Sequence, residues 1–296
     1  MSRSPIPGTI SSKIRNRFIR LSKRKVIPIG ELAETRRLSS EMSANVMTYD
    51  RLGDYDPAHA VYIVCQNLVS VFAEHLSTFP EMKAYCKLAG RAEDLYIPQG
   101  PPISPLTGSY FTLWAFFDLT FGGFRETIGT CFLDLAGLLG VDDHLIGAAG
   151  FFQSSRMGIY EHYGKKAGLI ELREMLTGKS FSCICPAGYS GRKRELWYVR
   201  ILPSPIDGIS HSVIMTTPYV LIGHSQKEWI DFFERHGISR SDPKIDEKLH
   251  TFMKHGESVH FWNEFIFEGY FNHRRDVIFL EGIPDLPETL PHSEDH

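Results

Sequence analysis

No carboxylate occurs among the first 30 residues of this 296-residue chain, although the same stretch carries eight Lys or Arg residues. The first acid is Glu31, and the remaining 266 positions hold 24 basic against 35 acidic residues, a formal charge of about −11. A basic N-terminal segment is therefore joined to an acidic body. This polarity limits the partners that each part of the chain can attract.

The sequence also lacks the short motifs that most directly indicate a reaction, namely GxSxG, HExxH, GxGxxG and paired CxxC. The five cysteines are odd in number and widely spaced, with no secretory signal, which favours reduced thiols in an intracellular compartment. The longest apolar stretch, 110–124, is interrupted by Asp118 and is shorter than the roughly 20 residues of a bilayer span. We expect a soluble cytoplasmic protein without a transmembrane segment, and no cofactor is indicated.

The basic segment has the pattern of an amphipathic helix over residues 11–26. Ile14, Phe18 and Leu21 fall at helical spacing among seven basic residues. Four interpretations stay open: an organellar transit peptide that would direct the protein to a matrix or stroma, a membrane-surface anchor, a nucleic-acid-binding tail, or a solvated terminus.

The remaining pattern predicts an α+β fold, with a mostly helical N-terminal core followed by a small antiparallel strand pair and further helices. We expect residues 1–55 to be a basic arm and tether, and residues 56–296 a single domain. Within that domain a helical part would cover 56–176, a mixed strand and helix part 177–282, and a tail 283–296. No repeat is visible.

The individual elements follow from periodicity, caps and breakers. Asp56 and Pro57 begin a helix over 60–76, and Ser225 with Glu228 forms a capping box for a helix ending at His236. Further helices are expected at 31–43, 80–88 (ending at Gly90), 110–121, 125–139, 142–152, 243–254 and 258–267, a proline-rich connection at 98–105, and strands at 194–202, 211–222 and 277–280.

The strongest candidate site is a loop of sequence GYSGRKR, in which Gly188 and Gly191 precede Arg192, Lys193 and Arg194. Glycines let backbone amides approach an anion, and guanidinium groups grip phosphate or carboxylate in a bidentate manner. The loop lacks the GKS or GKT ending of a nucleotide P-loop. We therefore predict an anion-binding loop, the alternative being a solvated turn whose charges protect a strand edge.

Two carboxylates in the apolar helical region suggest an enzymatic alternative. Glu126 and Asp134 are eight residues apart, nearly the same face of a helix, so both could border one cavity as a general acid or base acting on an anionic small molecule. Otherwise both would be paired structurally. If the role is catalytic, Glu126→Gln should abolish activity without changing the melting temperature; if it is structural, stability should change.

A metal site is the second alternative. Glu257, His260 and Glu264 share a helical face, as do Glu247 and His250, but about one such Glu-x-x-His pair is expected by chance at this composition. Cys183 and Cys185 would point to the same side of an extended segment, yet zinc needs four ligands. The leading interpretation is a binding or interaction protein, whose partners would be an anionic ligand, or nucleic acid through the basic arm.

Overall fold

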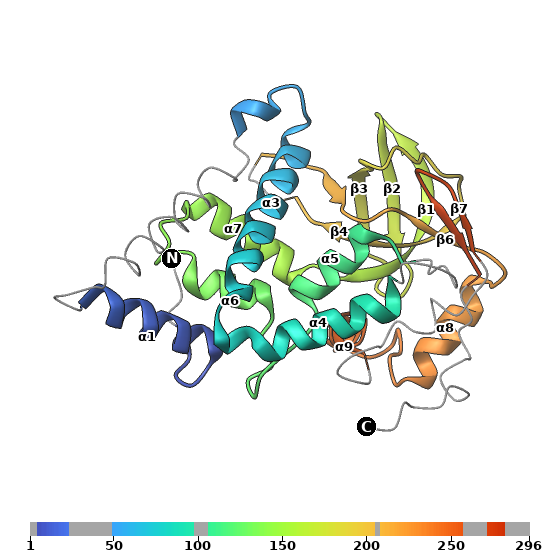
Figure 1. Ribbon diagram of the computed structural model, residues 1–296. Coiled ribbons are helices and arrows are strands. Elements are labelled where there is room, and N and C mark those ends of the chain that lie inside the picture. Colours follow the sequence, from blue (N-terminus) through green and yellow to red (C-terminus); the bar gives the residue numbers. More distant parts are fainter. Residues whose placement is uncertain (1–4, 24–48, 98–105, 205–207, 257–270, 282–296) are drawn as a thin grey trace. The chain divides into compact units, whose positions relative to one another are not determined.

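The computed structural model describes residues 5–23, 49–97, 106–204, 208–256 and 271–281 (Figure 1). The chain forms two compact units, defined by their internal contacts. Unit 1 comprises Met1–Leu95, Thr112–Ser154 and Pro205–Ile209, and unit 2 comprises Tyr96–Phe111, Ser155–Ser204 and Ser210–His296. Helices make up unit 1 and a sheet dominates unit 2, which confirms the α+β class.

Unit 1 is built around the long helix α3. Asp56 accepts hydrogen bonds from the amides of Ala58 and His59, with Pro57 in the first turn, so the predicted start is confirmed. The ring of Phe72 packs edge-on against Phe132, with centroids 5.0 Å apart. The helical elements are α1 (Ile10–Lys23), η1 (Tyr49–Leu52), α3 (Pro57–Ser77), η2 (Pro80–Met82), α4 (Lys83–Tyr96), α5 (Gly108–Phe117), α6 (Ile128–Leu135) and α7 (Asp143–Ser154).

Several helix boundaries differ from the prediction, among them the end of the helix expected over 125–139, which lies at Leu135. The helix expected to end at Gly90 continues to Tyr96, because one glycine in a helix interior costs only about 1 kcal/mol and good helix formers follow it. Residues 118–127 are not helical: Phe121 and Glu126 form a β-bridge around the Gly122–Gly123 turn. The segments 31–43, 98–105 and 258–267 lie outside the described residues.

The basic N-terminal segment does contain the predicted helix. In α1, Ile14 is fully buried, Ile10 is nearly so, and Phe18 packs against Phe79 with ring centroids 5.7 Å apart. Burial of this apolar stripe docks α1 within unit 1, which is not how a solvated terminus behaves.

Unit 2 contains an eight-stranded sheet in the order β1-β2-β3-β5-β4-β6-β8-β7. Because β1 also pairs with β4, the first five strands close into a small barrel, in which β3 and β5 are parallel. Its interior is packed around Trp197, Val199 and Leu172. The strands are β1 (Met157–Lys166), β2 (Leu169–Glu174), β3 (Ser180–Ile184), β4 (Leu196–Leu202), β5 (Ser212–Ile214), β6 (Tyr219–Leu221), β7 (Phe271–His273) and β8 (Ile278–Leu280).

The sheet is larger than the expected strand pair. The helical assignment of 56–176 was wrong for 157–174, where β1 and β2 form a hairpin through Ala167 and Gly168, both at positive φ. The expected strand at 211–222 is divided into β5 and β6. The strand expected at 277–280 is confirmed as β8.

Two helices complete the described part of unit 2. Helix α8 (Gln226–Arg235) begins with the predicted capping box, in which Ser225 and Glu228 bond reciprocally. Helix α9 (Ile245–His255) packs on it through Phe252, whose ring lies 5.8 Å from that of Phe233. Among the described residues, no helix is both long and apolar enough to cross a membrane.

Candidate anion-binding site

The loop between β3 and β4 is shaped by its two glycines. Gly188 has φ +88° and Gly191 has φ +65°, both in the left-handed region where a side chain is unfavourable. A Cβ at position 191 would lie 2.3 Å from the Trp197 ring, so this backbone can approach the barrel only because the residue is glycine. The predicted glycine-rich loop is therefore closely packed on β4.

His162 of β1 holds the same loop from the other side. Its Nδ1 accepts a hydrogen bond from the amide of Gly164 (3.0 Å), which leaves Nε2–H to donate to the carbonyl oxygen of Ser190 (3.1 Å). Burial lowers the pKa of His162, and the ring is therefore neutral at neutral pH. A neutral imidazole thus fixes the loop backbone.

Glu195 fixes an aromatic side chain of the loop. Its carboxylate accepts hydrogen bonds from the Tyr189 hydroxyl (3.0 Å) and from Nε1 of Trp197 (2.9 Å). Burial and the hydrogen bond to Glu195 raise the pKa of Tyr189 to about 12. Both oxygens of Glu195 are therefore occupied within the protein, and the Tyr189 ring is held in one place.

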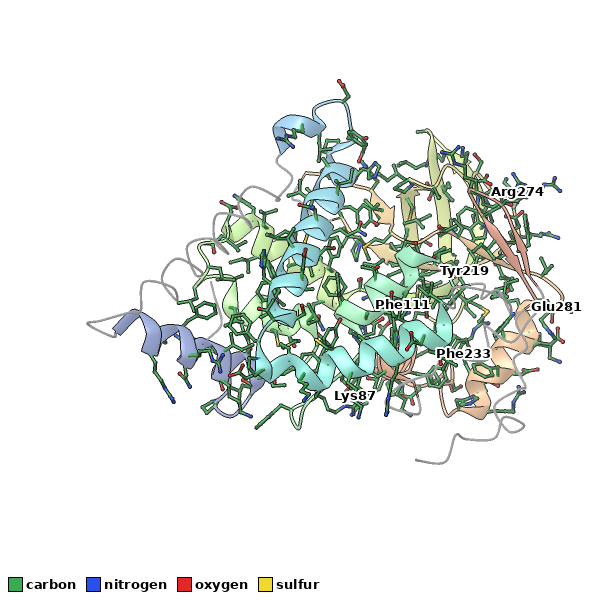
Figure 2. The ribbon with its side chains drawn as sticks, in the orientation of Figure 1. Lys87, Phe111, Tyr219, Phe233, Arg274 and Glu281 are labelled. Carbon is green, nitrogen blue, oxygen red and sulfur yellow. The ribbon has the colours of Figure 1, made fainter. Side chains whose placement is uncertain are left out.

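A cavity of about 430 Å³ opens beside this loop. Arg192 borders it from the loop, while Arg274, Asp276 and Phe279 border it from the β7–β8 hairpin, where Figure 2 labels Arg274. The Tyr189 and Phe279 rings meet edge-on, with centroids 6.2 Å apart, and form an aromatic wall. The cavity is therefore lined by two arginines and by two aromatic side chains.

The charged side chains around the cavity differ in whether they have a partner within the protein. Arg274 lies 3.5 Å from Asp276, which is a loose ion pair at an exposed position. The guanidinium of Arg192 makes no hydrogen bond or ion pair with any residue that the structure describes. At the edge, Lys165 donates to the Ser190 hydroxyl over 2.7 Å. An anion entering the cavity would meet a cation that is not already paired within these residues.

The two other predicted loop residues do not border the cavity. The Lys193 side chain lies against Gly164. Arg194 has φ +74°, and its amide donates to the carbonyl oxygen of His162 (2.8 Å), so its backbone helps to fix the loop. The contribution of Arg274 to this site was missed, because the parallel pairing of β6 with β8 brings it near a loop about 80 residues earlier.

The candidate acid–base residues Glu126 and Asp134 do lie together, at the start of α1. Glu126 is buried and accepts hydrogen bonds from the amides of Ile10 (2.6 Å) and Ser11 (3.0 Å). The Ser11 hydroxyl lies 2.9 Å from Glu126 and 2.7 Å from Asp134. A carboxylate that receives the first amides of a helix stabilises its positive end. These contacts favour the structural alternative.

The candidate metal ligands Glu257, His260 and Glu264 lie outside the described residues. Within the described ranges no group of three His, Cys, Asp or Glu residues is placed to hold a metal ion. Cys183 and Cys185 pack on the same barrel core, as their spacing predicted, and all five cysteines are free. Burial raises the pKa of Cys185, which is typical of an inert packing thiol.

Comparison of the chain with models of protein families, with curated proteins and with solved structures found no match.

Proposed function

We propose that this protein is a binding module for an anionic small molecule, held in the cavity between the 188–195 loop and the β7–β8 hairpin. The observation that carries the proposal is the pair of arginines, Arg192 and Arg274, that border this cavity of about 430 Å³. Guanidinium groups recognise phosphate and carboxylate through charge-assisted, bidentate hydrogen bonds.

The volume and the lining residues of the cavity limit the class of ligand that it can hold. A volume of about 430 Å³ falls within the range of small-molecule sites. Tyr189 and Phe279 both line the cavity, so a ring attached to the anion would bury apolar surface against them. Asp276 adds an acceptor for a hydroxyl or amine of the ligand. A phosphorylated or carboxylated compound with an attached ring fits these features best.

The rigidity of the loop supports binding. His162, Glu195 and the two glycines hold the loop backbone and the Tyr189 ring in place without a ligand. A site that is already ordered loses little conformational entropy when it binds, and more of the interaction energy then appears as affinity.

Calorimetric titration of the full chain tests the proposal, first with inorganic phosphate and then with a nucleoside monophosphate as a phosphate that carries a ring. We expect the ring-bearing probe to bind more tightly, and Arg192→Ala and Arg274→Ala each to weaken binding about tenfold or more. The matched control is Arg275→Ala, because Arg275 is exposed and adjacent but does not border the cavity.

Two results would contradict the proposal. Binding that is equally strong in Arg192→Ala and in the unchanged chain would place the anion elsewhere. A loss of the same size in Arg275→Ala would mean that general positive charge, and not this cavity, attracts the probe.

A further inference from the structure

A second basic feature lies in unit 1 and is independent of the cavity. In α1, Lys13, Arg17 and Arg20 are exposed and follow one another at intervals of four and three residues. Such spacing puts all three on one face of the helix. No acid occurs anywhere in α1. The exposed face of this docked helix therefore carries three cations and no acid.

Helix α4 carries a similar stripe. Lys83, Lys87 and Arg91 are exposed and spaced by four residues, and Figure 2 labels Lys87 on this helix. Of the two acids of α4, Asp94 lies three residues after Arg91 on the same face, so the stripe ends at Arg91.

The α1 stripe approaches the α4 stripe at η2, the 3-10 helix that directly precedes α4. Arg17 of α1 forms an ion pair with Glu81 of η2 (3.2 Å), directly before Lys83. Phe18 packs against Phe79 at the same junction, and α1 and α4 lie close together within the unit (Figure 1). Arg17 of the first stripe therefore lies close to the segment from which the second stripe begins. We call this surface the basic ridge: Lys13, Arg17, Arg20, Lys83, Lys87 and Arg91.

The ridge carries an unfavourable arrangement of charge. Like charges at i and i+4, as in Lys83–Lys87 and Lys87–Arg91, destabilise a helix. Apart from Arg17, its members form no ion pair with any residue in the described ranges. The body from Glu31 onward has a surplus of acids that could have been placed beside these cations. An external polyanion would relieve the repulsion that the protein leaves uncompensated.

The apolar side chains distinguish between the two main kinds of polyanion. A helix that lies in a membrane surface inserts its apolar face into the lipid. Here Ile10 and Ile14 of α1 and Tyr85 of α4 are buried inside unit 1. Two large apolar residues near these helices are exposed, Ile6 before α1 and Leu95 at the far end of α4, and both lie beyond the ends of the two stripes. The ridge therefore presents charge without an apolar wedge, which suits solvated phosphates better than a bilayer.

We propose that the basic ridge binds the phosphate backbone of nucleic acid through Lys13, Arg17 and Arg20 of α1 together with Lys83, Lys87 and Arg91 of α4. Contacts to phosphate position a nucleic acid without reading its bases, so binding is independent of sequence and strongly dependent on salt.

Fluorescence anisotropy of the full chain tests this, with a labelled DNA duplex and an RNA strand of equal length over a range of salt concentrations. The variant is K83A/K87A/R91A. We expect affinity at low salt to fall about tenfold or more, and the slope of log affinity against log salt to become shallower by about 2 to 3. The control is K166A/K227A/R275A, which removes the same charge from exposed positions of unit 2 and should change affinity less than about twofold.

A third variant, K83R/K87R/R91K, keeps the charge and should keep binding, so the test does not depend on one variant folding. Unchanged affinity in K83A/K87A/R91A would overturn the proposal, as would equal losses in that variant and the control. Vesicles containing phosphatidylserine serve as the second probe. Strong binding to them without binding to DNA or RNA would also overturn it and identify the ridge as a membrane-facing surface.

Discussion

The charged groups at the start of α1 and in the 188–195 loop differ in how completely the protein satisfies them. Glu126 receives two backbone amides and the Ser11 hydroxyl, and it is buried. Arg192 borders an open cavity, and its guanidinium has no partner among the described residues. Glu126 is thus a charge that stabilises the fold, whereas Arg192 is a charge that is available to a ligand. The predictions below can break or sharpen this distinction.

The largest effect is expected at Glu126. Replacing it by alanine leaves the amides of Ile10 and Ser11 buried without acceptors, which should lower the free energy of unfolding by about 3 to 5 kcal/mol. Glu126→Gln should have a smaller effect, about 2 kcal/mol, because one oxygen remains. Urea denaturation measures both changes. Asp134→Asn is the control, since Asp134 is half-buried; a loss as large as that of Glu126→Ala would show that the pair acts as one unit.

Gly191→Ala should have the next largest effect and lower the free energy of unfolding by about 2 to 3 kcal/mol. The new Cβ would meet the Trp197 ring at 2.3 Å, and alanine is strained at φ +65°. Gly188→Ala is a matched control, because its φ is also positive but no atom lies within 4 Å of the new Cβ. Strain alone should cost it about 1 kcal/mol. Equal urea midpoints in the two variants would mean that the loop shifts and thereby relieves the close contact with Trp197.

The pH dependence of stability should report on His162. Its pKa is lowered by burial, so the unfolded chain takes up the proton first when the pH falls below about 6.5. The contribution of His162 is therefore complete above this pH and is lost as the pH falls toward the folded pKa, with a slope of at most about 1.4 kcal/mol per pH unit. Urea midpoints between pH 5 and 8 would show this dependence. His162→Gln should reduce it; an unchanged profile would contradict the assignment.

Local signals in the sequence were sufficient to predict much of the fold. Asp56 with Pro57, and Ser225 with Glu228, mark helix starts through contacts within three residues, so both could be read directly. The hairpin of β1 and β2 had a local signal too, the Ala167–Gly168 turn, but the first half of β1 is buried on both faces and lacks alternation. Without alternation the strand pattern was not recognised.

The candidate site could be predicted only in part, because its halves come from distant segments. Arg192 was found through the two glycines before it, which act locally. Arg274 reaches the cavity through strand pairing between β6 and β8, and nothing near it in the sequence indicates that neighbour. Glu126 and Asp134 were expected on one helix face, but Glu126 precedes α6, and the two carboxylates are instead joined through Ser11 of α1, more than 110 residues away.

The smallest change in stability is expected from Arg192→Ala. Since its guanidinium has no partner among the described residues, the urea midpoint should shift by no more than the equivalent of about 0.5 kcal/mol, although the affinity for phosphate falls. Removal of a cation close to Arg274 should even relieve repulsion slightly. Urea denaturation and phosphate titration of the same preparation separate the two effects. A loss of stability comparable to that of Glu126→Ala would make Arg192 a structural charge, and the distinction between the two sites would then fail.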